Sequence, residues 1–158
     1  MNPFHIELRT LPAEGRHVAG TLPPAFFDLA PGDSVQAASP LAYDLRILRE
    51  GDSLHVSGSL EAGFSLQCGR CLERFPHRVR LENFEEEAPL ENESTTDLTE
   101  LVREDILLAL PSYPRCEDGN VEQRECPAEG KFERDDTPDA DGLPGAERGI
   151  WNALDQLK

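Results

Sequence analysis

Four cysteines are the residues of this sequence best suited to chemistry. Two of them are separated by only two residues in LQCGRCLERF, and the other two follow far along the chain. Four thiolates can form a closed, tetrahedral zinc site, and a C-x-x-C spacing on a tight turn supplies half of such a site. Nine residues separate the last two cysteines, which specifies the other half only loosely, and His77 could replace one of them. The predicted cofactor is zinc, and the predicted ligands are Cys68, Cys71, Cys116 and Cys126.

Two other interpretations of the Cys68/Cys71 pair stay open. A redox-active pair usually lies at the N-terminus of a helix, where backbone N–H groups lower the pKa of the thiol. Strands, and no helix, are predicted on both sides of this pair. Arg70 and Arg74 are the residues that could lower the thiol pKa instead. The third interpretation is burial without chemistry, because free cysteine often packs as a small hydrophobic residue.

A basic cluster surrounds and follows the second cysteine of this pair. Arg78 and Arg80 share one face of a predicted strand, since side chains alternate between the two faces. Such a cluster can bind RNA phosphates locally even in an acidic protein. The same arginines could instead neutralise the acidic run at residues 82–93. The predicted contacts with RNA or a partner in this cluster are Arg70, Arg74, Arg78 and Arg80.

Alternation of apolar and polar residues predicts the strands that position these side chains. A first strand is predicted at residues 4–8. Four consecutive strands joined by short turns follow, which is the pattern of an antiparallel meander. They are predicted at residues 41–50, 54–58, 64–68 and 77–84, with turns at Gly51-Asp52, at Ala62-Gly63 and at the cysteine pair.

The period of the apolar residues becomes helical between residues 95 and 111. The apolar positions are Leu98, Leu101, Val102, Ile106, Ala109 and Leu110. Asp97 and Glu100 fit a capping box, and Pro111 is expected to stop the helix. The helix is predicted to pack on the apolar face of the sheet, with Glu100 and Glu104 on its outer surface as further partner contacts.

These elements predict an α+β fold, in which one capped amphipathic helix packs on an antiparallel β-meander. Residues 1–116 are predicted to form the compact domain. Residues 117–147 are acidic, rich in Gly and Pro and nearly free of large apolar side chains, so they are predicted to be a flexible linker. Residues 148–158 are predicted to form a short C-terminal helix, because their apolar residues recur at helical spacing. These residues are Ile150, Trp151, Leu154 and Leu157.

The formal net charge of −16 restricts the classes of partner. Nucleic-acid binding depends mainly on phosphate neutralisation, so broad, nonspecific binding to nucleic acid is excluded. The charge suits basic partners, although it could also serve only to maintain solubility. The sequence opens without the pattern of a secretory signal, and no run approaches the roughly 20 apolar residues that cross a bilayer. A cytoplasmic protein without a membrane partner is therefore predicted.

The motifs of common enzymes are absent from the sequence. It contains no P-loop, no dinucleotide-binding glycine turn, no H-E-x-x-H motif and no nucleophile elbow. The four histidines are scattered, and none is clearly paired with a nucleophile. We therefore expect a protein that is not an enzyme.

Two motifs resemble those of a known family. CGRCLE at residues 68–73 resembles the C-x-R-C-L-E hallmark of the YceD family, bacterial proteins described as large ribosomal RNA subunit accumulation proteins. DL at residues 97–98, followed by VREDILLALP at 102–111, is similar to the family's helix motif. WNALDQLK at 151–158 is similar to its usual end. The resemblance spans roughly residues 41–127 and the last ten residues, with motifs in the family's order.

The resemblance implies a role in accumulation of 23S ribosomal RNA, and hence in large ribosomal subunit biogenesis. The implied partners are the large-subunit precursor and a basic ribosomal protein or assembly factor, with local RNA contact. Many members also carry a C-P-x-C-G knuckle where this chain has CPAEG at residues 126–130, so Glu129 replaces its last cysteine and implies a partly eroded zinc site. Arg70 and Glu104, within the matched motifs, are expected to pair. The alternative function is a cytoplasmic thiol redox or regulatory protein that uses Cys68 and Cys71.

Overall fold

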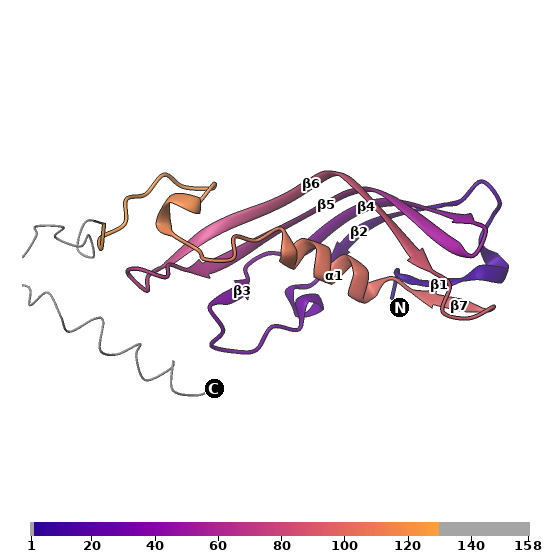
Figure 1. Cartoon of the computed structure of the whole chain (residues 1–158), viewed down its shortest axis with the longest axis horizontal. Coiled ribbons are helices and arrows are strands. Elements are labelled where there is room, and N and C mark those ends of the chain that lie inside the picture. The colour runs from indigo at the N-terminus through magenta and orange to yellow at the C-terminus, as the bar shows by residue number, and fades with distance from the viewer. Residues whose placement is uncertain (1, 130–158) are drawn as a thin grey trace, which may run out of the picture.

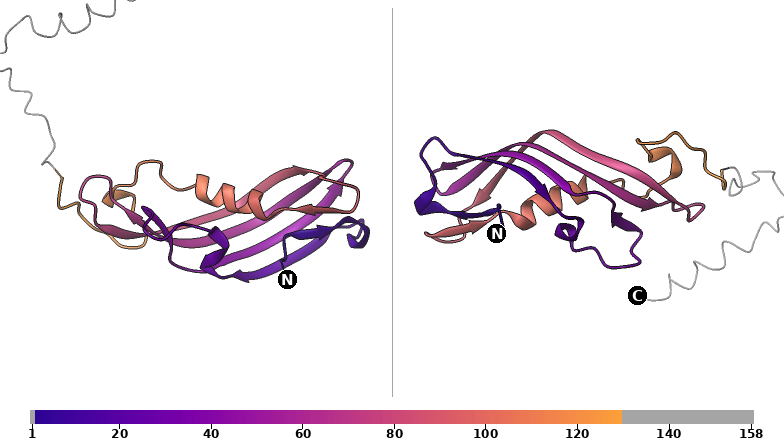
Figure 2. Two further views of the ribbon diagram at one scale, coloured as in Figure 1. Left: turned by 90° about the horizontal axis from the view of Figure 1, so that it is seen from below. Right: turned by 180° about the vertical axis from the view of Figure 1, so that it is seen from behind.

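The computed structural model describes residues 2–129, which form a long, curved antiparallel sheet with one helix packed against it (Figures 1 and 2). The strands are β1 (His5–Glu7), β2 (Arg16–Leu22), β3 (Val35–Ala37), β4 (Leu41–Glu50), β5 (Ser53–Gln67), β6 (Arg74–Pro89) and β7 (Thr95–Asp97). The helix is α1 (Thr99–Leu108), and the short 3-10 helices are η1 (Leu8–Thr10), η2 (Pro24–Phe27) and η3 (Cys116–Asp118).

The main sheet has five strands, with β5 at its centre. β4, β5 and β6 form a meander, and β2 pairs with the outer edge of β4. β3 and β4 share one edge of β5, because β4 pairs with residues 53–61 of β5 and β3 pairs with residues 64–66. β6 pairs along the other edge, and β1 and β7 form a separate two-stranded sheet. The β5–β6 hairpin is therefore the longest unit of the fold.

The predicted α+β class is wrong. Strands make up most of the regular structure of residues 2–129, and α1 is the one α-helix among them. The predicted C-terminal helix at residues 148–158 lies outside the described residues, as do residues 130–147 of the predicted linker. The described chain is therefore mainly β.

The predicted turn at Ala62-Gly63 does not form. The two strands predicted at residues 54–58 and 64–68 are parts of the single strand β5. Its even-numbered residues from Leu54 to Cys68 face the core without a change of phase, and nearly all of them are buried. A turn would have reversed the chain, so this continuous alternation decides in favour of one strand.

A β-bulge divides β6 and explains its mixed pattern of apolar residues. Gly58 of β5 pairs with Phe84, whereas Leu60 pairs with Leu81, so β6 places two residues opposite one. The bulge moves the buried face of β6 from odd-numbered residues to even-numbered ones, such as Phe84. Both halves of the strand thereby present apolar side chains to the same core.

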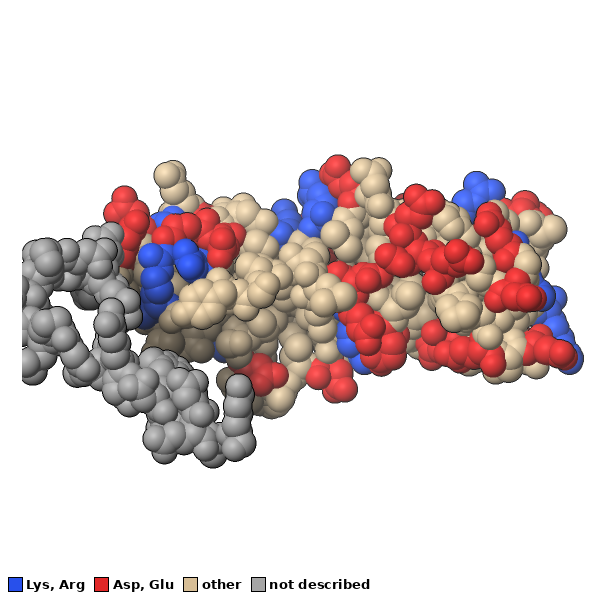
Figure 3. Space-filling model, viewed as in Figure 1, with Lys and Arg blue, Asp and Glu red and all other residues tan. Residues whose placement is uncertain are grey.

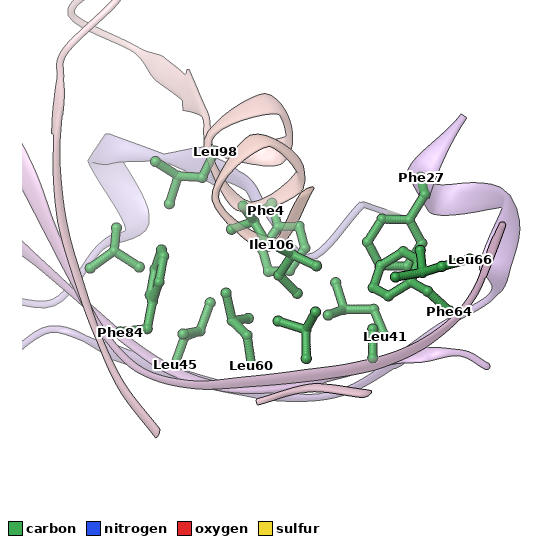
Figure 4. Packing of buried hydrophobic residues seen from close by; sticks show 14 of the residues in the cluster. Phe4, Phe27, Leu41, Leu45, Leu60, Phe64, Leu66, Phe84, Leu98 and Ile106 are labelled. Carbon is green, nitrogen blue, oxygen red and sulfur yellow. The ribbon is translucent and has the colours of Figure 1, made fainter. Parts of the chain in front are cut away.

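Helix α1 covers the core on the concave face of the sheet. Leu98, Val102 and Ile106 are buried, and Figure 4 shows Leu98 and Ile106 pointing toward Leu45 and Leu60 of the sheet. The predicted packing of the helix on the apolar face is thus seen. No helix within residues 2–129 has the length and apolar character needed to cross a lipid bilayer.

The predicted capping box of α1 is wrong. Leu98 occupies the N-cap position and makes no side-chain cap. Asp97 instead ends β7, and its Oδ1 accepts a hydrogen bond of 2.8 Å from the Thr99 N–H. The Leu98 N–H donates to the Phe4 carbonyl at 2.9 Å, so pairing of β1 with β7 fixes where the helix begins.

Candidate metal centre

All four cysteines meet at one end of the sheet. Cys68 directly follows β5, and Cys71 lies in the turn before β6. Cys116 begins η3, and Cys126 lies ten residues further along. Their four Sγ atoms lie within 4.8 Å of one another. Residues 117–129, the part of the predicted linker that the structure describes, therefore pack at this end of the sheet (Figure 1).

The sulfur spacing fits a tetrahedral zinc ion. A Zn–S distance of about 2.3 Å in a tetrahedron separates neighbouring sulfur atoms by about 3.8 Å. Sγ of Cys68 lies 3.8 Å from Sγ of Cys126, and Sγ of Cys71 lies 3.5 Å from Sγ of Cys116. All four are free cysteines, and three of them are buried. Since the set contains four soft thiols and leaves no open position, it suits a structural zinc ion.

Backbone hydrogen bonds hold the first cysteine pair in a tight turn. The Leu72 N–H donates to the Cys68 carbonyl at 3.0 Å, and the Cys68 N–H donates to the Glu73 carbonyl at 2.9 Å. The Gly69 N–H donates to the Pro114 carbonyl at 2.8 Å, which ties the turn to the segment that follows α1. A Cβ at Gly69 would lie 2.8 Å from the ring of Tyr113, so glycine is what allows the two segments to approach this closely.

The second cysteine pair is positioned by contacts with β6. The Asn120 side chain accepts a hydrogen bond from the Arg78 N–H and donates one to the Arg78 carbonyl, both at 2.7 Å. His77 Nδ1 lies 2.8 Å from the Asp118 carbonyl oxygen. His77 thus binds backbone, and the fourth metal-ligand position belongs to Cys126. Glu129 is exposed, and its N–H donates to the Cys126 carbonyl at 3.0 Å, so the four-thiol set is complete without a ligand at residue 129.

The environment of the cluster favours one thiolate before any metal binds. Burial raises the pKa of the Cys68 thiol, but hydrogen bonds from the backbone N–H groups of Cys71, Arg70 and Cys116 outweigh burial and lower that pKa to about 6. Burial raises the pKa of Cys116 to about 12, and it also raises the pKa of Cys126. Backbone N–H groups aimed at a cysteine sulfur stabilise a thiolate, which is the form that binds metal.

Two arginines lie beside the cluster. Arg70 forms an ion pair with Glu117, and Arg124 forms one with Glu73 at 2.7 Å. The Glu117 hydrogen bond raises the pKa of Arg70, and negative charge at Cys126 and Cys68 adds to this effect. In both arginines the Nε atom is buried and has no hydrogen-bond partner among the described residues. A zinc ion with four thiolates carries a net charge of −2, so two adjacent guanidinium groups suit it.

The other predicted contact residues do not form one free basic patch. Arg70 pairs with Glu117, so the expected pairing with Glu104 is wrong. Arg74 donates to the Ser65 and Asp33 carbonyls. Arg78 and Arg80 share one carboxylate, Glu61, at 3.6 and 2.8 Å.

The two predicted contacts on α1, Glu100 and Glu104, are both exposed. They lie along the helix, away from the cysteine cluster, and Glu100 also pairs with Arg103. Arg124 is the residue at the centre that sequence reasoning missed. Its signal was a basic residue close to a cysteine, since Arg124 precedes Cys126 by two residues as Arg70 precedes Cys71 by one.

Comparison of the chain with protein-family models, with curated proteins and with solved structures returned no significant match.

Proposed function

We propose that this chain is a cytoplasmic, non-enzymatic binding protein with a structural zinc ion, and that it supports 23S ribosomal RNA accumulation and large ribosomal subunit biogenesis. The observation that carries the structural role is the convergence of four thiols within 4.8 Å from two distant segments. Cys68, Cys71, Cys116 and Cys126 would hold the ion, which would join the β5–β6 turn to the segment after α1. A metal with all its positions filled by protein orders a surface and leaves no position for a substrate.

The ribosomal assignment is supported by the motifs around this centre. Two motifs resemble those of the YceD family. Residues 68–73 form the cysteine turn, and residues 102–111 form most of the helix and the residues that follow it. Both motifs lie on one connected unit, because the Gly69 N–H donates to the Pro114 carbonyl just beyond the helix motif. A shared surface that includes the turn and the helix is therefore the region in which we expect a partner to bind.

The charge distribution supports a basic partner. Figure 3 shows acidic side chains gathered over the half of the molecule that contains β1, β7 and the start of α1. Glu100 and Glu104 are exposed on this helix. Opposite charge accelerates encounter and fixes orientation in a complex. A basic ribosomal protein or assembly factor in the large-subunit precursor suits this surface.

The test is co-sedimentation of the zinc-loaded chain with large-subunit precursor particles. We expect binding, and we expect loss of the protein from cells to lower the amount of 23S ribosomal RNA. Glu100→Lys with Glu104→Lys should weaken binding, whereas Glu14→Lys with Asp52→Lys makes the same charge change in exposed turns as a control. Normal amounts of large subunit in cells that lack the protein contradict the proposal.

Local RNA contact is tested separately. Arg74, Arg78 and Arg80 all lie before the bulge on one face of β6. If they bind phosphates, replacing each with Glu weakens association with the particles, and the loss of affinity on adding salt becomes shallower. If the association keeps its strength and its salt dependence, these arginines do not contact RNA. The proposal of a protein partner is not affected by that result.

One observation favours a thiol redox or regulatory role as the second candidate. The pKa of Cys68 falls to about 6, because backbone N–H donors outweigh the opposing effect of burial. A thiolate at neutral pH is the reactive form, but Cys68 is fully buried. Titration of thiolate absorbance and of thiol reactivity separates the two roles: fast oxidation of Cys68 by added peroxide in the zinc-loaded protein, reversed by a thiol reductant, supports redox chemistry. Inert thiols that react only after zinc removal support the structural role.

A further inference from the structure

An apolar groove lies beside the end of α1. Its volume is about 400 Å³, which falls within the range of roughly 300–1,000 Å³ typical of sites for small ligands. It is therefore large enough to hold a few apolar side chains. The apolar residues that line it are Leu29, Val35, Leu107, Leu108, Leu110 and Pro111.

Leu108 is the most unusual member of this groove. Its exposed fraction is 80%, the largest among the exposed large hydrophobic residues that the structure describes. Single exposed leucines are ordinary, but here Leu108 continues a set of neighbouring apolar side chains from α1 and from the loop before β3. Contiguous apolar surface of this kind marks a place where another segment packs. Figure 3 shows mainly uncharged atoms over the end of α1.

The chain itself carries a segment that matches the groove. Residues 148–158 place apolar side chains at i, i+1, i+4 and i+7, and residues 133–147 before them contain one large apolar residue, Leu143. The segment includes Trp151, the single tryptophan of the protein. Burying an indole removes about 150–250 Å² from water, so an apolar cavity is a strong attraction for it. Arg148 and Lys158 lie at the two ends of the segment, and Asp33 lines the groove.

The tether is long enough to bring the two together. Arg124, five residues before the end of the described chain, donates to the Arg74 carbonyl at 2.9 Å. Arg74 in turn donates to the carbonyl of Asp33, which lines the groove, at 2.6 Å. Two arginine side chains therefore link Arg124, near the end of the described chain, to a residue that lines the groove. Residues 130–147 span up to roughly 60 Å when extended and about 20–25 Å as a relaxed coil. A tether of this length gives an effective concentration on the order of millimolar.

We propose that residues 148–158 of the same chain dock as an amphipathic helix in the groove between the end of α1 and β3, with Trp151 buried against Leu108. The docked segment covers the exposed leucine. This inference does not rest on the ribosomal role, because it concerns only how the chain covers its own apolar surface.

Trp151 provides a direct test in the full-length, zinc-loaded protein, because it is the only tryptophan. We expect blue-shifted emission and weak quenching by acrylamide. Leu108→Glu should shift the emission to the red and raise the quenching constant severalfold, while the sheet stays folded, since Leu108 contributes little buried surface within residues 2–129. Val121→Glu makes the same kind of change at another exposed apolar residue, outside the groove, and should leave the emission unchanged.

A second variant separates docking from an indirect effect. Leu154→Glu alters the segment instead of the groove, and it should change Trp151 emission as much as Leu108→Glu does. The double variant should add nothing further, because either change alone releases the segment. Emission of a fully exposed indole in the unaltered protein overturns the proposal, as does emission that Leu108→Glu leaves unchanged. Blue-shifted emission that is lost on dilution overturns it in favour of a second copy in the groove.

Discussion

The Sγ atoms of Cys71 and Cys116 lie 3.5 Å apart although 45 positions separate the two residues in the sequence. Between them the chain runs along β6, forms β7 and α1, and returns to the end of the β5–β6 hairpin. A metal ion held by both residues closes this long excursion into a ring. Closing a long loop lowers the entropy of the chain. The free energy of metal binding would offset this loss and hold the two ends of the loop together.

Removing zinc should loosen one end of the molecule and leave the sheet intact. The core beneath α1 is built from residues such as Leu45, Leu60 and Ile106, far from the thiols, whereas residues 112–129 contain few buried side chains. At a zinc concentration 100-fold above the dissociation constant, a bound zinc ion would stabilise the fold by about 2.7 kcal/mol. We expect one zinc ion per chain by elemental analysis, and faster hydrogen exchange at residues 112–129 after chelation.

Cys126→Ser is the control for this experiment. It removes one ligand, so it should lower zinc content and reproduce the exchange pattern of the chelated protein. Equal exchange with and without chelator, in a protein shown to contain zinc, contradicts a structural role for the ion.

Arg70 and Arg124 should tune zinc affinity through charge. Each has a buried Nε without a hydrogen-bond partner among the described residues, and both lie beside the thiol cluster. Arg70→Met or Arg124→Met keeps much of the side-chain volume and removes the positive charge, so zinc affinity should fall by about 10-fold or more. Competition with a metal-sensitive dye measures the change. Arg78→Met removes an arginine that faces Glu61, and it should leave the affinity unaltered. A loss of similar size in Arg78→Met assigns the effect to overall charge.

The local elements of the metal centre could be predicted from the sequence, but the long-range contacts that bring the four cysteines together could not. The C-x-x-C turn and the helix at residues 99–108 follow from local spacing, and both form where they were expected. The partner cysteines are set by long-range packing of residues 112–129 on β6, through contacts such as Asn120 with Arg78. A one-residue bulge between Gly58 and Leu60 likewise leaves no local signal except a change of phase. At Ala62-Gly63 the alternation of apolar and polar residues continues without a break, so the sequence itself favours one strand there over the expected turn.

Gly58 should tolerate no side chain. Its φ is +147°, a conformation that L-residues rarely adopt, and it pairs with Leu45 beside the bulge. A Cβ there would overlap the Asp44 carbonyl oxygen and lie 3.0 Å from Cα of Leu45. Gly58→Ala should therefore lower the free energy of unfolding in urea by at least about 3 kcal/mol.

Gly51→Ala separates the two causes of this loss. Gly51 also has a positive φ, but a Cβ there would meet nothing within 4 Å. This variant should cost only about 1 kcal/mol, the price of the left-handed conformation. If both variants lose the same amount, close packing of β5 against β4 is not the reason for glycine at residue 58.

Asp105 should destabilise the fold at neutral pH. Burial raises the pKa of its carboxyl group, and the nearby charges of Glu86 and Glu104 raise that pKa further. One carboxyl oxygen is buried without a hydrogen-bond partner among the described residues. Because the pKa is higher in the folded state than in the unfolded one, the cost of ionisation is fully present at a pH above the folded pKa. The cost disappears as the pH falls below the unfolded value of about 3.9.

Asp105→Asn removes this charge with little change of shape. It should raise the free energy of unfolding at pH 7 by only a few tenths of a kcal/mol, because solvent screens this partly exposed group, and the gain should vanish near pH 3. Urea denaturation of both proteins at each pH measures the difference in their free energies of unfolding. Loss of metal at acid pH affects both proteins equally, so it does not contribute to that difference. Asp52→Asn, at an exposed turn, should show no such trend. A gain that is independent of pH, or a loss of stability at pH 7, contradicts the assignment, because only relief of a buried charge produces a gain that fades as the carboxyl group becomes protonated.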